Sequence, residues 1–218
     1  MLINILAYQG MTMLDAIGPY DVLGRLPGAR VQFVASGRDA ITSDTGFLTF
    51  LPGCELDAAG QADVLLVPGG PPEHVMPVAQ DPAIQQWLRQ QHEGSRYTAS
   101  VCTGALILIA AGVITEGGVS SHWMAADTIA DMGLAYNGER ITRSGKVFTA
   151  AGVSAGIDMA LALSAAIADQ VTAQAIQAGI EYDPAPPFPY TGDDPAVREL
   201  AGRLLQDSLG ATRAPGNP

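Results

Sequence analysis

Hydrophobic residues follow two alternating patterns along the chain: short continuous apolar runs, and longer segments in which apolar positions recur at helical spacing. The continuous runs predict strands at residues 2–7, 30–35, 47–51, 63–68 and 96–101. The helical spacing predicts helices at residues 12–26, 81–92, 103–111, 122–132, 153–168 and 195–209. Residues 140–149 predict a β-hairpin around Ser144-Gly145. This alternation is typical of an α/β fold.

The run DVLLVP at residues 63–68 indicates whether the sheet is parallel or antiparallel, because it is apolar at nearly every position. Such a strand is buried on both faces, as in a parallel sheet covered by helices on either side. Ligands of these sheets bind where the carboxyl ends of the strands meet. Gly69-Gly70 follows this strand and Cys102 follows another. These two turns are therefore the first places to look for a functional site.

No internal repeat, block of like charges or long linker interrupts the chain. We therefore expect one domain over residues 1–210, followed by a flexible tail at residues 211–218. The prolines between residues 183 and 189 exclude regular secondary structure from that segment.

The composition narrows the class of protein. The 22 acidic and 11 basic residues give a net charge of -11, which argues against binding to nucleic acid or to an anionic membrane surface. The start of the chain, MLINILAY, lacks the basic residues and cleavage site of a signal peptide. The longest apolar stretch, residues 105–114, is too short to span a bilayer. We expect a cytoplasmic protein whose two cysteines stay reduced.

Cys102 lies where a predicted strand gives way to a predicted helix. Free N–H groups and the dipole at a helix start stabilise a thiolate, so this position predicts a lowered thiol pKa and a nucleophile. The alternative is an ordinary buried thiol, since free cysteine is among the most buried residue types.

Two further features have both a functional and a structural interpretation. Gly69-Gly70 either lets backbone N–H groups face a developing anion or forms a simple tight turn. Asp15 stands among apolar neighbours early in a predicted helix. Burial there would raise its pKa and suit it to carry protons, whereas an exposed carboxylate would only favour the helix start.

The remaining polar candidates favour structural roles. Thr103 is expected mainly to cap the helix that follows Cys102, and His122 to be a structural histidine. Cys54 has no helix start to activate it, so we interpret it as incidental. The scattered histidines and cysteines have no metal-ligand spacing, and no phosphate-binding glycine motif occurs.

Taken together, these residues resemble the ThiJ/PfpI superfamily, which includes the parkinsonism-associated chaperone and deglycase proteins. Within it, the sequence is most similar to isocyanide hydratases, in the segments LDAIGPYDVL, SVCTGALILIAAGVI, SHW, SAGID and EYDPAPPF. The resemblance runs from Leu2 to about Leu209. It implies a flavodoxin-like α/β sandwich with a mostly parallel central sheet, helices on both faces and a nucleophile elbow at Cys102. The segment PGGPP departs from the PGG-T/S-G pattern expected there.

The resemblance also implies an activity. Cys102 would attack an isocyanide and form a thioimidate, with Asp15 moving protons, and water would release an N-substituted formamide. Thr103 would join these catalytic residues, and Gly69 and Gly70 would bind the substrate and stabilise charge. Neither a cofactor nor a metal is implied, and the partners expected are a small-molecule substrate and a second copy in a homodimer.

Two other functions remain open. A glyoxalase or deglycase of the same superfamily would use the same thiolate on an aldehyde. A non-catalytic redox sensor or regulatory domain would use Cys102 for oxidation alone. Asp15, where many members carry Glu, favours the hydratase. Thr103 stands where related proteases and amidotransferases often carry His, which disfavours those activities.

Overall fold

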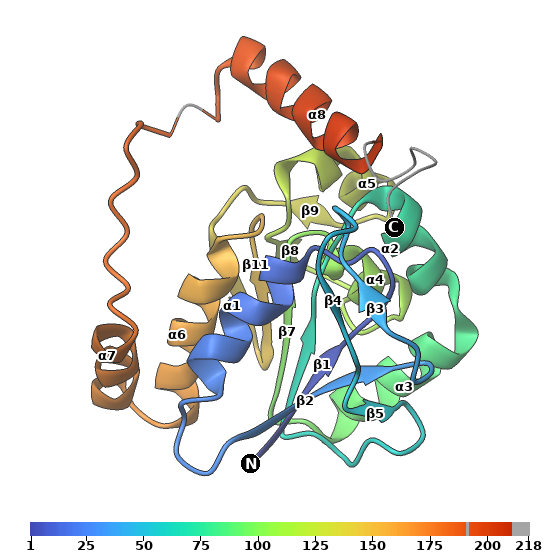
Figure 1. Cartoon of the computed structure of the whole chain (residues 1–218), viewed down its shortest axis with the longest axis vertical. Coiled ribbons are helices and arrows are strands. Elements are labelled where there is room, and N and C mark those ends of the chain that lie inside the picture. The colour runs from blue at the N-terminus through green and yellow to red at the C-terminus, as the bar shows by residue number, and fades with distance from the viewer. Residues whose placement is uncertain (191, 211–218) are drawn as a thin grey trace.

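The centre of the fold is a seven-stranded sheet in the order β10–β11–β7–β6–β1–β2–β5. The structure is a computed structural model that describes residues 1–190 and 192–210 of the chain (Figure 1). The strands are β1 (Leu2–Leu6), β2 (Arg30–Ala35), β5 (Cys54–Glu55), β6 (Val64–Val67), β7 (Tyr97–Val101), β10 (Ile141–Ser144) and β11 (Val147–Ala150). Every neighbouring pair is parallel except the β10–β11 hairpin. The predicted mostly parallel sheet is therefore confirmed.

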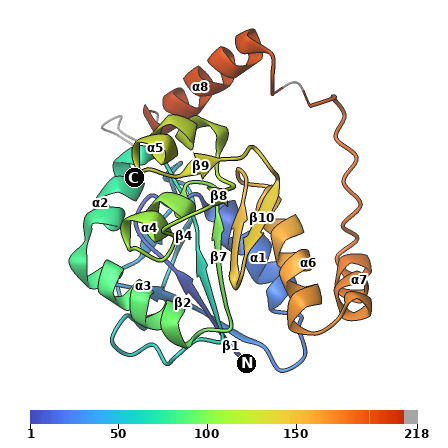
Figure 2. The same cartoon turned by 180° about the vertical axis from the view of Figure 1, so that it is seen from behind.

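Helices cover both faces of this sheet (Figures 1 and 2). One face carries α1 (Met13–Leu23) and α6 (Ala155–Ile167), with α7 (Gln170–Gly179) packed outside α6. The other carries α2 (Pro72–Gln80), α3 (Pro82–Gly94) and α4 (Gly104–Ala110). All four residues of β6 are buried, as predicted for a strand covered on both sides.

Most predicted elements are present, and the exceptions have local causes. The carboxylate of Asp81 caps α3, accepting from the N–H groups of Ala83 and Ile84. The helices α2 and α7 were not predicted; in α2, proline at the first turn and inside the helix concealed it. Residues 47–51 do not extend the main sheet, because β4 (Thr49–Phe50) pairs only with β3 (Ile41–Thr42). The edge strand is instead β5.

The turns after four central strands meet at one edge of the sheet. β11, β7, β6 and β1 are parallel neighbours, so their carboxyl ends point the same way. The segments that follow them are residues 151–154, 102–103, 68–71 and 7–12. The topology therefore brings Cys102, Gly69-Gly70 and the start of α1 to the same place.

Close packing of α1 on α6 fixes the position of Asp15. A Cβ added at Gly18 would lie 3.0 Å from Cγ1 of Ile157, and one at Gly156 would lie 3.2 Å from Cγ of Pro19. Because both positions lack a side chain, the two helices approach closely. The first turn of α1 is thereby held beside the start of α6.

The C-terminal part of the described chain is less closely attached. Residues 182–190, which we call the arm, have no regular secondary structure, as the prolines predicted. The arm leads from α7 toward α8 (Pro195–Gly210), which lies across the top of Figure 1 near α5 (Ala126–Asp131). No helix within residues 1–190 and 192–210 is long and apolar enough to cross a membrane. The predicted tail, residues 211–218, lies outside the described residues.

Candidate active site

Cys102 occupies the turn that joins β7 to α4. Its φ of 57° lies in the left-handed region, which residues with side chains rarely adopt. Two hydrogen bonds run from its N–H to the carbonyls of Ala150 and Ala151, at 3.2 and 3.1 Å. Its own carbonyl accepts from Oγ of Ser121 at 2.8 Å. These bonds hold the strained turn in place, and the side chain is only 5% exposed.

Asp15 lies in the first turn of α1 and is fully buried. Its Oδ2 accepts a hydrogen bond from the N–H of Gly69 at 2.9 Å. Its Oδ1, also buried, has no nitrogen or oxygen partner among the residues that the structure describes. The side chain of Cys102 lies near this carboxyl and lowers its pKa. The structure thus brings together the two residues that the sequence singled out as nucleophile and proton carrier.

Burial controls the charge of Asp15. The pKa of this carboxyl is raised from 3.8 to about 7, chiefly by burial and also by the negative charge of Asp44. The Gly69 N–H and the Cys102 side chain lower this pKa. Near neutral pH, Asp15 can therefore both hold and release a proton.

Burial also raises the pKa of the Cys102 thiol well above its usual range, and the neighbouring Asp15 carboxylate adds to the effect. The N–H groups of Val153 and Thr103 lower it. The predicted lowering of the thiol pKa is therefore wrong. Burial and the neighbouring carboxylate destabilise the thiolate by more than the two N–H groups stabilise it. Asp15 and Cys102 together favour a state that holds at least one shared proton.

Thr103 uses its hydroxyl to hold the Gly-Gly turn. Its Oγ1 accepts from the N–H of Gly70 at 2.9 Å and donates to the carbonyl of Gly70 at 2.7 Å. It makes no side-chain cap on α4, so the predicted capping role is wrong. The N–H groups of Gly69 and Gly70 are thus bonded to Asp15 and Thr103. Through these bonds, the two N–H groups position the side chains of Asp15 and Thr103.

We expect Gly69→Ala to damage both stability and activity. A Cβ here would lie 2.5 Å from both N and Oγ1 of Thr103, so the turn must move and the bond to Asp15 with it. A loss of about 1–3 kcal/mol in the free energy of unfolding is expected from urea denaturation. Gly37→Ala is the matched control, because a Cβ there meets nothing within 4 Å. Equal stability of the two variants would contradict this packing argument.

Two residues near the site were not singled out from the sequence. Val153 contributes its backbone N–H to the Cys102 sulfur and has a φ of 28°, a strained value for a β-branched residue. Tyr8 is buried and donates from its hydroxyl to the carbonyl of Pro68 at 3.0 Å. Each residue follows a strand of the parallel sheet, and this position is the only feature by which the sequence could have indicated it. Neither the backbone contact nor the ring orientation has a sequence signature.

Comparisons with known proteins agree with this fold. The sequence model of the DJ-1/PfpI family matches residues 1–166. The chain belongs to the DJ-1/PfpI family. It is 38% identical over 194 residues to isonitrile hydratase of Pseudomonas putida, an alignment covering 89% of this chain and 84% of that protein. Isonitrile is another word for isocyanide.

Two other proteins that are similar to this chain give structural and functional context. A THiJ/PfpI family protein from Pseudomonas syringae superposes with a TM-score of 0.85 at 32% identity, covering 98% of this chain and 90% of that one. The glutathione-independent glyoxalase DJR-1.2 of Caenorhabditis elegans is 27% identical over 99 residues, which is 45% of this chain and 52% of that protein. The proteins similar to this chain thus include two that are named for different reactions.

The sequence of this DJ-1/PfpI chain also singled out Cys54 and His122. Cys54 is in β5 at the sheet edge, and burial raises the pKa of its thiol. His122 accepts the Met124 N–H at Nδ1 at 3.3 Å, and burial lowers its pKa. Within the described chain, no three His, Cys, Asp or Glu residues are grouped so that they could hold a metal ion.

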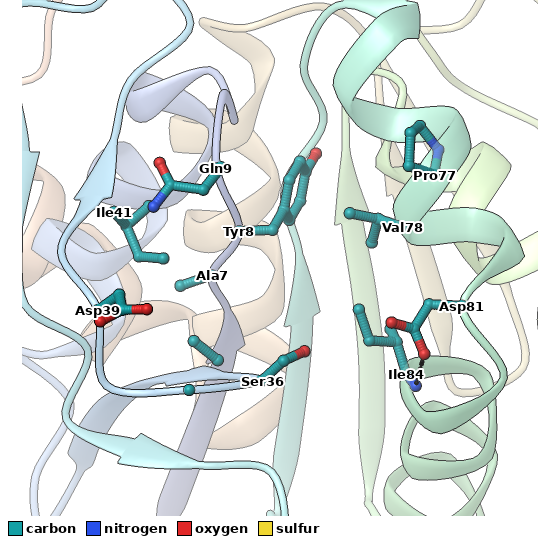
Figure 3. A pocket seen from close by; sticks show the side chains of 12 residues that line it. Ala7, Tyr8, Gln9, Ser36, Asp39, Ile41, Pro77, Val78, Asp81 and Ile84 are labelled. Atoms are coloured by element: carbon teal, nitrogen blue, oxygen red, sulfur yellow. Dashed lines mark hydrogen bonds between the residues drawn. The ribbon is translucent and has the colours of Figure 1, made fainter.

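A cavity of about 320 Å³ lies beside Tyr8, between the ends of β1 and β2 and the helices α2 and α3 (Figure 3). Its interior is apolar, with Tyr8, Ile41 and Ile84 among the lining residues, and Asp39 and Asp81 are its acidic groups. Cys102 and Asp15 do not line it. We call it the Tyr8 cavity.

Proposed function

We propose that this protein hydrates isocyanides to N-substituted formamides, with Cys102 as nucleophile and Asp15 as proton carrier. The observation that carries the proposal is the buried pair itself. Asp15 has one oxygen fixed by Gly69 and the other free of nitrogen and oxygen partners, next to the only thiol at the site among the described residues. The similarity to isonitrile hydratase over most of the chain supports the choice of reaction.

In the first step, the sulfur of Cys102 bonds to the terminal carbon of R–N≡C. The thiol proton passes to Asp15, and Asp15 delivers a proton to the same carbon. The product is a thioimidate, R–N=CH–S–Cys102, in which the proton and the sulfur have both added to the isocyanide carbon. A carboxyl with a pKa of about 7 suits this transfer in both directions.

In the second step, Asp15 accepts a proton from water as the water oxygen adds to the thioimidate carbon. Asp15 returns that proton to the nitrogen, and then accepts the hydroxyl proton of the adduct as the carbon–sulfur bond breaks to give R–NH–CHO. Sulfur leaves as a thiolate, which takes the proton from Asp15. The N–H groups of Val153 and Thr103, which act on this sulfur, stabilise the leaving thiolate. We assign Gly69, Gly70 and the Thr103 hydroxyl to positioning, because they hold Asp15 and the turn.

The charges near the site favour a neutral substrate. No Lys, Arg or His of the described chain contributes to the pKa shift of Asp15 or Cys102. A dicarbonyl needs donors for two oxygens, whereas an isocyanide needs only a nucleophile and a proton carrier. The glyoxalase reading is therefore the weaker of the two reactions. A redox role for Cys102 would require no proton carrier with a tuned pKa.

The test compares substrates on one preparation. We expect kcat/KM for p-nitrophenyl isocyanide, followed as the formamide, to exceed kcat/KM for methylglyoxal, followed as lactate. Mass spectrometry of a slow variant should detect an adduct of isocyanide mass on Cys102. Equal or reversed preference without such an adduct would overturn the hydratase proposal and leave the nucleophile standing. Oxidation of Cys102 without turnover of either substrate would support the redox sensor.

We also propose that the protein forms a homodimer in the cytoplasm. Support for self-association comes from α8, where Leu200, Leu204 and Leu205 are all at least 46% exposed. Exposed apolar side chains at helical spacing are typical of a face that another surface covers.

A further inference from the structure

A second, larger cavity lies under the arm. Its volume is about 900 Å³, within the range that takes a whole small molecule. Its outer wall is formed by the arm and α8, and its inner wall by the first turn of α6. Four aromatic residues line it: Trp123, Tyr182, Phe188 and Tyr190. We call it the arm cavity; Figure 1 shows the arm and α8 that bound it.

The inner wall of the arm cavity is formed by residues that neighbour the segments around Cys102 and Asp15. Ser154, which lines it, directly follows Val153, whose N–H contacts the Cys102 sulfur. Ile157, also in the lining, packs against Gly18, which is about one helical turn after Asp15. The cavity thus lies one residue beyond Val153 and beside the helix that carries Asp15, although neither Cys102 nor Asp15 lines it.

The charged side chains of the lining are already paired. Arg140 forms an ion pair with Asp158, and the hydroxyl of Tyr182 donates to Asp158 at 2.9 Å. The guanidinium of Arg198 lies over the Trp123 ring, 5.1 Å from its centroid. What the cavity offers a ligand is consequently apolar and aromatic surface rather than an unpaired charge.

The aromatic groups of the arm are themselves exposed. Phe188 is 78% exposed and Tyr190 is 85% exposed, so their rings have surface to bury against a ligand. Moreover, the arm and α8 lie beyond residues 1–166, which the DJ-1/PfpI family model matches. The outer wall of the cavity is thus built from a part of the chain that the shared family core does not include.

We infer that the arm cavity binds the substituent of the isocyanide and selects bulky neutral groups, above all aryl groups. This inference rests on the proposed function for the identity of the substrate. Binding the ring between the arm and α6 would hold the terminal carbon toward Cys102. Small alkyl isocyanides would react without using the cavity.

The test measures kcat/KM for 2-naphthyl isocyanide and for methyl isocyanide. We expect Phe188→Ala to lower the value for the naphthyl substrate about tenfold and to change the value for the methyl substrate less than about twofold. Phe47→Ala is the matched control, because Phe47 is similarly exposed, at 73%, and does not line the cavity. Val78→Phe, which narrows the Tyr8 cavity, should leave the ratio of the two values unchanged.

Several outcomes would overturn the inference. One is an equal loss on both substrates in Phe188→Ala; another is a change of the ratio in Val78→Phe alone, which would place the substituent in the Tyr8 cavity. A loss of dimer mass in Phe188→Ala with an unchanged ratio would assign the arm to a second copy instead. Absence of all isocyanide turnover in the wild type would overturn the proposed function. In that case, the Kd of N-(2-naphthyl)formamide tests the cavity. A Kd that rises in Phe188→Ala but not in the control variants supports binding in the arm cavity, and an unchanged Kd in Phe188→Ala overturns it.

Discussion

Replacing Cys102 by alanine is expected to abolish isocyanide hydration, lowering kcat by at least about 10³-fold while the fold stays intact. Without the sulfur, no covalent intermediate can form, and Asp15 has no thiol from which to take a proton. The side chain lost is small, and the bonds to Ala150, Ala151 and Ser121 come from the backbone of residue 102 and remain. Formamide production by the variant measures the loss, and thermal unfolding checks the fold.

The second cysteine of the chain provides the control. Cys54 is in the edge strand β5, away from the catalytic pair, so Cys54→Ala should keep both activity and stability close to those of the wild type. Any substantial hydration by Cys102→Ala would show that the reaction does not pass through a thioimidate on this residue.

Replacing Asp15 by asparagine is expected to lower kcat by about 10²–10⁴-fold. Asparagine keeps the size of the side chain and an oxygen that can accept from Gly69, but it cannot carry a proton. The thioimidate should then persist long enough for mass spectrometry to find it on Cys102. Asp21→Asn is the matched control, because Asp21 lies on the same helix with 56% of its side chain exposed.

The same substitution should reveal the buried carboxyl through stability. The pKa of Asp15 is about 7 in the folded protein and near 3.8 when unfolded, so the folded state binds the proton more tightly. This contribution to stability is complete below about pH 4 and is lost as the pH rises toward 7. Asp15→Asn should therefore be more stable than the wild type at pH 8, on the order of a few kcal/mol, with the gain vanishing near pH 4.

Urea unfolding at several pH values separates the two roles of Asp15. A proton carrier buried beside a thiol predicts both the activity loss and the stability gain at high pH. Near-normal kcat with a stability that does not depend on pH would return Asp15 to the role of an ordinary carboxylate at a helix start.

The hydrophobic pattern alone was enough for most of the sheet and for the location of the site. Apolar runs such as Val64–Val67 can be buried only between two layers, so they predict a parallel sheet with helices on both faces. The shared direction of parallel strands then places Gly69-Gly70 and Cys102 at one edge. The helix α2 escaped prediction because proline disfavours helix interiors, yet Pro72 and Pro77 are accommodated.

Pairwise contacts at the site could not be predicted in the same way. In the sequence, the position of Thr103 predicts a helix cap. In the structure, its hydroxyl is hydrogen-bonded to the backbone of Gly70 instead. Likewise, Val153 acts through a backbone N–H, which every residue except proline possesses. Such roles depend on which groups the tertiary structure places within hydrogen-bonding distance.

The sequence by itself determined the α/β class, the strand ends that carry Cys102 and Gly69-Gly70, and the presence of an acid early in the first helix, because these follow from local pattern. Only the tertiary structure decided the direction of the thiol pKa. That direction depends on how completely water is excluded and on the distance between two potential anions, Asp15 and Cys102, which are 87 positions apart in the chain. Burial and charge proximity are properties of the packed molecule, and no local stretch of sequence encodes them.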